Sequence, residues 1–219
     1  MRSQRKYYLI AILFIIIVLG CSGLFIHRNK QTTTLKQAIN IAFKEARNWA
    51  DDPELIQIIS TDAEDNTSDI RGEDGKRNSW NVFFTSKKKG MQYNVFVING
   101  KAKYNNEIQM PVYETIDIDN NILLDSSDAE QIAKDIGLKP IPQNEGWAIG
   151  YQYALQFVSA SSAPPFLAML IYGKLNGYFS YVVIDPETGN IITIMQQVGY
   201  DEDGRAIWKE KTELISQSD

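Results

Sequence analysis

Cysteine and histidine are almost absent from this chain of 219 residues. Its one cysteine, Cys21, and its one histidine, His27, both lie in or beside an apolar N-terminal segment. A disulfide within one chain is therefore impossible, and the rest of the sequence lacks the side chains that bind zinc and most transition metals. The same absence excludes a Cys-His pair and a Ser-His-Asp triad from that part.

Phosphate-binding motifs are absent as well. No GxxxxGK[ST] or GxGxxG sequence follows a predicted strand, so nothing supports nucleotide binding. Paired carboxylates are the one catalytic arrangement that 27 acidic residues always permit. We therefore expect a protein that is not an enzyme and that needs no cofactor, with calcium as the one metal to consider.

Acidic charge is absent from one end of the chain. Residues 1–30 hold five of the 22 basic residues and none of the 27 acidic ones, which leaves the remaining 189 residues with 17 basic groups and a charge of −10. A body this acidic does not favour nucleic acid or anionic lipid as a partner. We expect no nucleic-acid binding.

The N-terminal segment is long, apolar and uncharged from Tyr7 through Ile16 to Ile26. As a helix, its twenty residues would span roughly 30 Å, the thickness of a bilayer's hydrocarbon core. The basic residues before it favour a cytoplasmic N-terminus. The sequence thus predicts a single-pass anchor in a bacterial cytoplasmic membrane, with the rest of the chain outside the cytoplasm.

A lipoprotein signal is the alternative interpretation of the same segment. Residues Val18-Leu19-Gly20-Cys21 resemble a lipobox, in which the cysteine is lipidated and becomes the new N-terminus. The apolar run continues past Cys21 to Ile26, which a lipoprotein does not need. Both interpretations, and simple secretion, place the remainder outside the cytoplasm.

The sequence predicts that the outer part has two similar halves, 31–110 and 111–219. They follow the leader and anchor at 1–30. The first begins with an amphipathic helix of about 16 residues from Leu35, and the second with a helical stripe from Ala129 to Ile136. Alternating apolar residues and turn signals predict strands after each helix. These strands are expected at 54–61, 80–86, 92–99, 101–104, 112–118, 147–159, 166–172, 178–184, 191–198 and 205–210. We predict an α+β protein with two units, each a helix packed on its own antiparallel sheet.

The second half resembles the PepSY domain family. The likeness is carried by the helix sequence at 128–133 and by the run from Tyr181 to Ile192, a strand, a DPETG turn and a second strand. The first half shares only the alanines of its helix and lacks the Thr-Gly turn. The resemblance implies a PepSY/cystatin-like fold without catalytic residues, and a role in binding or restraining other extracytoplasmic proteins.

A calcium loop is the best candidate for a metal site. Five oxygen-bearing residues occupy positions 1, 3, 5, 9 and 12 of an EF-hand-like loop. They are Asp117, Asp119, Asn121, Asp125 and Asp128. Position 6, which should be glycine, is Ile122, and the competing interpretation is a polar turn followed by a helix cap.

Aromatic residues are abundant on the predicted strands of the second half. Four of them, Tyr151, Tyr153, Tyr178 and Tyr181, are candidates for a ligand groove, although strand spacing favours packing on a sheet face. We expect Trp208 to close the core. The leading prediction is a membrane-anchored module that binds or regulates another envelope protein. The alternative is a lipoprotein that binds a small or wall-derived ligand.

Overall fold

A computed structural model describes residues 31–61, 72–109, 114–122, 124–142, 148–160 and 163–211. Residues Thr32–Asp219 form one compact unit. In these described ranges, no helix is long and apolar enough to cross a membrane. The predicted anchor, represented by Tyr7, Ile16 and Ile26, and the candidate lipidation site Cys21 lie outside the described residues.

The first predicted helix is confirmed as α2, Leu35–Trp49. Thr34 is its N-cap, and its side chain accepts from the backbone of Gln37 while the Gln37 amide oxygen accepts from the backbone of Thr34. This capping box satisfies two amides that the helix itself leaves without partners. One stripe of the helix is fully buried and consists of Leu35, Ala38, Ile39, Ala42 and Ala46.

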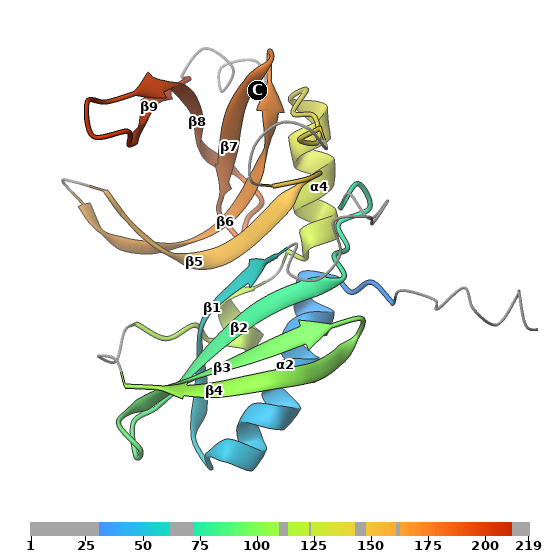
Figure 1. The fold of residues 1–219 in the computed structure, drawn as a ribbon, viewed down its shortest axis with the longest axis vertical. Helices are drawn as coiled ribbons and strands as arrows, with labels where there is room; N and C mark the ends of the chain where they lie inside the picture. Colours follow the sequence, from blue (N-terminus) through green and yellow to red (C-terminus); the bar gives the residue numbers. More distant parts are fainter. Residues whose placement is uncertain are drawn as a thin grey trace, which may run out of the picture. The chain divides into compact units, whose positions relative to one another are not determined.

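Four strands follow α2 and pair in sequence order as antiparallel neighbours. They are β1 (Pro53–Ser60), β2 (Ser79–Ser86), β3 (Met91–Ile98) and β4 (Lys101–Ile108). Asn99 and Gly100 both adopt positive φ, 51° and 71°, as the predicted two-residue turn between β3 and β4 requires. Helix α2 contacts all four strands and lies behind them in Figure 1.

In its described residues, the second half contains two short helices and five strands. These are α3 (Ile118–Asn121), α4 (Ser126–Asp135), β5 (Gln152–Ala160), β6 (Ala163–Leu175), β7 (Tyr178–Ile184), β8 (Ile191–Tyr200) and β9 (Ala206–Glu210). The DPETG sequence forms the predicted turn, in which the Asp185 carboxylate accepts from the amides of Glu187 and Thr188. These hydrogen bonds lower the pKa of Asp185.

The predicted fold class, two units with separate sheets, is wrong. The nine strands of the described ranges form one antiparallel sheet in the order β4-β3-β2-β1-β5-β6-β7-β8-β9. The halves join where Ile58 pairs with Leu155 and Ile59 with Ala154. The physical reason is that β1 would otherwise be an edge strand with open backbone groups, and β5 pairs with part of that edge. The predicted boundary near residue 110 falls at 110–113, outside the described residues.

Polar contacts between α2 and α4 also join the two halves. The first amides of α2 donate to residues that begin α4: Leu35 N to Ser126 Oγ at 2.9 Å and Lys36 N to Asp125 Oδ1 at 3.0 Å. Ser126 in turn donates its hydroxyl to the carbonyl of Gly75 at 2.5 Å. Orphan donors at one helix start are thus satisfied by the cap of another helix.

A buried arginine makes a further connection between the halves. Arg77 lies fully inside the protein, and its Nη1 donates to the carbonyls of Ile149 and Tyr151 at 3.0 and 3.1 Å. Burial lowers the pKa of Arg77 to about 10, so the side chain remains a cationic donor at neutral pH. It holds the segment that leads into β5 against the start of β2.

Strands β5, β6 and β7 have buried residues on both of their faces. The face toward α4 belongs to the main core, with Tyr153, Leu155 and Ile171 fully buried. The opposite face has a smaller buried cluster of Ala154, Ala168, Leu170 and Val183. Strands β5 and β6 are strongly bowed (Figure 1), and a hollow of about 630 Å³ lies on this second face. The hollow is where the candidate site lies.

Candidate functional site

Four aromatic side chains gather on the second face of the sheet. Tyr172 comes from β6, Phe179 and Tyr181 from β7, and Trp208 from β9. The ring centroids of Tyr181 and Trp208 lie 4.8 Å apart in an edge-on contact, and Tyr172 lies 5.3 Å from Tyr181. Phe179 lies 5.8 Å from Trp208. Alternation along each strand puts Tyr181 two residues from Phe179 on the same face.

Three of these rings line a hollow of about 630 Å³. Tyr172, Tyr181 and Trp208 are half-buried, so part of each ring remains open to a ligand. The rest of the lining is mostly apolar and consists of Phe157, Val158, Phe166, Leu170, Val183 and Met195. Gln156, Ser159 and Thr193 add hydrogen-bonding groups. The volume falls within the range of roughly 300–1,000 Å³ that is usual for small-molecule sites.

The residues that line the hollow carry no formal charge in the part of the chain that the structure describes. No Lys, Arg, Asp or Glu is among those lining residues. Burial, with a smaller contribution from Tyr181, raises the pKa of Tyr172 to about 12, and burial also raises the pKa of Tyr181. Both phenols therefore stay protonated at physiological pH. The Thr193 hydroxyl donates to Glu210 at 2.8 Å, which fixes its orientation.

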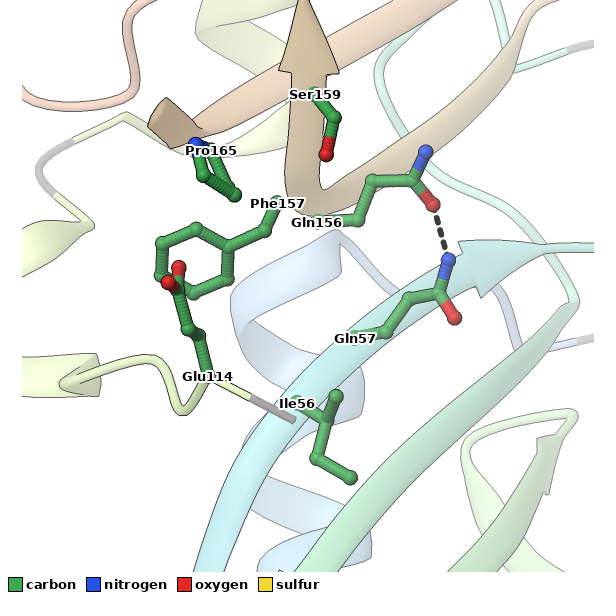
Figure 2. A pocket seen from close by; sticks show the side chains of 7 residues that line it. All are labelled: Ile56, Gln57, Glu114, Gln156, Phe157, Ser159 and Pro165. Atoms are coloured by element: carbon green, nitrogen blue, oxygen red, sulfur yellow. Dashed lines mark hydrogen bonds between the residues drawn. The ribbon is translucent and has the colours of Figure 1, made fainter. Parts of the chain in front are cut away.

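A second groove of about 580 Å³ lies at the junction of the two halves, where β1 and β5 diverge. Figure 2 shows the amides of Gln57 and Gln156 pointing toward one another, joined by a hydrogen bond from Gln57 Nε2 to Gln156 Oε1. Phe157, Pro165 and Glu114 lie on the other side of this groove (Figure 2). We call it the fork, defined by Ile56, Gln57, Glu114, Gln156, Phe157, Ser159 and Pro165.

The structure separates the four tyrosines that the sequence suggested for one groove. Tyr151 and Tyr153 are buried on the core side, where their hydroxyls donate to the carbonyls of Leu138 and Gly72. Tyr178 is 56% exposed on another part of the surface. Tyr181 alone lies in the aromatic hollow. The strand alternation that was available in the sequence already put Tyr178 and Tyr181 on opposite faces of β7.

Trp208 lines the hollow and is half-buried, whereas the sequence suggested a closing core residue. Its aromatic neighbours, Phe179 and Tyr181, have the alternating strand spacing that the sequence analysis used. The missing signal was the pairing of β9 with β8, which brings Trp208 opposite Gln197 and beside Tyr181.

The residues suggested for calcium serve local structure. Asp125 and Asp128 form the capping box of α4, and Asp117 accepts from the amide of Asp119. Within the described ranges, no three or more His, Cys, Asp or Glu side chains form a group that could hold a metal ion. Asn121 belongs to α3, but its side chain is outside the described set. Sequence spacing remains the only basis for the calcium prediction.

No protein-family model matches the chain, and no curated protein matches it. Among solved structures, the chain is similar to the crystal structure of a candidate lipoprotein from Clostridium difficile 630, with 10% sequence identity and a TM-score of 0.43. The similarity covers 71% of this chain and 90% of that one.

Proposed function

We propose that this protein is a non-catalytic lipoprotein that binds a wall-derived saccharide outside the bacterial cytoplasmic membrane. The ligand occupies the hollow on strands β5 to β9. The observation that carries the proposal is the set of half-buried rings of Tyr172, Tyr181 and Trp208 in a neutral hollow of about 630 Å³.

The chemistry of the hollow suits a sugar ring. One face of a sugar presents C–H groups, which pack on the flat surface of an aromatic ring, while its edge presents hydroxyls. Tyr and Trp combine an apolar body with a polar tip, and Gln156, Ser159 and Thr193 supply further hydrogen-bonding groups. A neutral lining favours an uncharged ligand because a buried charge without a partner is costly.

The N-terminal segment supports a location beside the wall. Residues Val18 to Cys21 have the lipobox pattern, and basic residues precede the apolar run. Lipidation of Cys21 would hold the chain at the outer face of the membrane, with the acidic outer part facing the wall. A neutral polysaccharide is compatible with this negative charge, whereas a polyanionic one would be repelled.

Retention on insoluble cell wall tests the proposal. Full-length protein in detergent is incubated with purified wall, and the bound fraction is measured for wild type, Trp208→Ala and a matched Trp49→Ala control. Trp49 is also half-buried, but it stacks on Tyr93 at 4.7 Å and does not line the hollow. Loss of a central aromatic contact should weaken binding at least about tenfold in Trp208→Ala, equivalent to about 1.4 kcal/mol.

The control variant should retain wild-type binding. Thermal midpoints of all three proteins are compared, and a Trp208→Phe variant, which keeps a ring in the same place, should recover part of the affinity. The proposal is overturned if wild type does not bind the wall, or if Trp208→Ala binds the wall as tightly as wild type does.

A further inference from the structure

The hollow and the fork meet at the end of strand β5. Gln156, Phe157 and Ser159 belong to the lining of both. Successive residues of a strand point to opposite faces of the sheet. Gln156 therefore lies on one face at this end of β5, and Phe157 and Ser159 lie on the other. A ligand in the hollow can therefore continue past this end of β5 and into the fork.

The fork exists because the pairing of β1 and β5 is short. These strands pair only at Ile58 with Leu155 and Ile59 with Ala154, while β5 pairs with β6 as far as Ala160. Nearer the start of β1, Leu55 forms an isolated bridge with Ile116, and the Ile116 amide donates to the Leu55 carbonyl at 2.7 Å. In the described part of the chain, the two strands thus separate beyond Gln57 and Gln156 and leave a groove between them.

The fork offers hydrogen bonds as well as apolar surface. The amides of Gln57 and Gln156 hold donors and acceptors, and their single hydrogen bond to one another leaves capacity for a ligand. The Glu114 side chain is exposed, and its carboxylate can accept hydrogen bonds from a ligand. Phe157 and Pro165 contribute an apolar wall (Figure 2). Hydroxyl-rich ligands match this combination better than a fatty acyl chain does.

We infer that the ligand is a linear saccharide chain that occupies the hollow and the fork together. The inference rests on the proposed function and adds a second subsite to it. Each groove alone is large enough for a small ligand, with volumes of about 630 and 580 Å³, and together they exceed the usual range for one. Continuity of the lining across Gln156, Phe157 and Ser159 favours one extended chain over two separate compact ligands.

Chain-length dependence tests the inference. The probes are a dimer and a hexamer of β-1,4-linked N-acetylglucosamine, titrated calorimetrically into full-length protein in detergent. The dimer can fill the hollow only, whereas the hexamer reaches the fork. Because the second contact is then intramolecular, the hexamer should bind at least about tenfold more tightly.

Variants of the fork identify where the gain arises. A Gln57→Ala, Glu114→Ala double variant should bind the hexamer no more tightly than it binds the dimer. Glu202→Gln, an exposed carboxylate in the turn before β9, is the matched control and should leave both affinities unchanged.

Each other outcome is decisive. Equal affinities for dimer and hexamer, or a tighter hexamer that the double variant does not weaken, overturn the fork subsite and leave the binding function of the hollow intact. Failure of both probes to bind, together with failure of wild type to bind purified wall, overturns the proposed function and the inference with it. If wild type binds purified wall but neither probe, the inference that the ligand is a linear saccharide chain of this type is wrong.

Discussion

Ser126 shows how one side chain can stabilise groups that are distant in the sequence. Its hydroxyl accepts from the amide of Leu35, 91 residues away, and donates to the carbonyl of Gly75, 51 residues away. It is fully buried. The sequence predicted capping residues near Asp125, because a cap depends on local neighbours. It did not predict the partners of Ser126, because they come together only when the halves fold against each other.

Replacing Ser126 by alanine should destabilise the fold. The change leaves the Leu35 amide and the Gly75 carbonyl without this partner in a buried place, and it should lower the free energy of unfolding by about 2 kcal/mol. Ser127→Ala is the matched control, because the Ser127 side chain is exposed, and it should change stability by less than about 0.5 kcal/mol. Urea unfolding followed by circular dichroism measures both; equal stabilities would contradict the assigned role.

Helices and strands followed the sequence pattern closely where the pattern was regular. The predicted strand at 178–184 is β7 at the same bounds, and the helix from Leu35 is α2. Both depend on apolar periodicity, which is local. Of the strand predicted at 112–118, the structure describes 114–118; this part has one bridge, at Ile116, and Ile118 begins α3. Polar residues interrupt the alternation there, so the pattern carried little information.

The N-terminal segment has two interpretations, an uncleaved membrane anchor and a lipoprotein signal. A substitution at Cys21 distinguishes them. In the native host, we expect wild type to be cleaved before Cys21 and to carry lipid, and Cys21→Ala to keep the full-length mass without lipid. Intact-mass spectrometry of the membrane fraction measures both. Full-length masses without lipid in both proteins, differing only by the mass of the substituted side chain, would instead identify an uncleaved anchor.

The whole molecule differs from the sequence expectation in how its halves combine. Periodicity shows which face of a strand is apolar, but it does not identify the neighbour of an edge strand. The pairing of β1 with β5 joins residues that are almost one hundred positions apart and makes one sheet from two similar series of elements. That junction also produces the fork, which no local motif indicated.

The aromatic hollow could be predicted only in part for the same reason. Tyr172, Phe179 and Tyr181 stand on strands that the sequence predicted well. Their position around an open hollow depends on the bowing of β5 and β6 and on the addition of β9, which brings Trp208 to them. Such curvature is set by bulges and pairing across the sheet, such as the shifts between Val158 and Ala160 and between Gln197 and Gly199.

Side-chain footprinting with hydroxyl radicals tests the central claim, that the hollow is the ligand site, most directly. Full-length protein is oxidised with and without saturating saccharide hexamer, and oxidation of individual residues is measured by mass spectrometry. We predict that Tyr181, Met195 and Trp208 become protected by the ligand while Trp49, remote from the hollow, is oxidised equally in both samples. Unchanged oxidation of Trp208 under saturating ligand would contradict the claim.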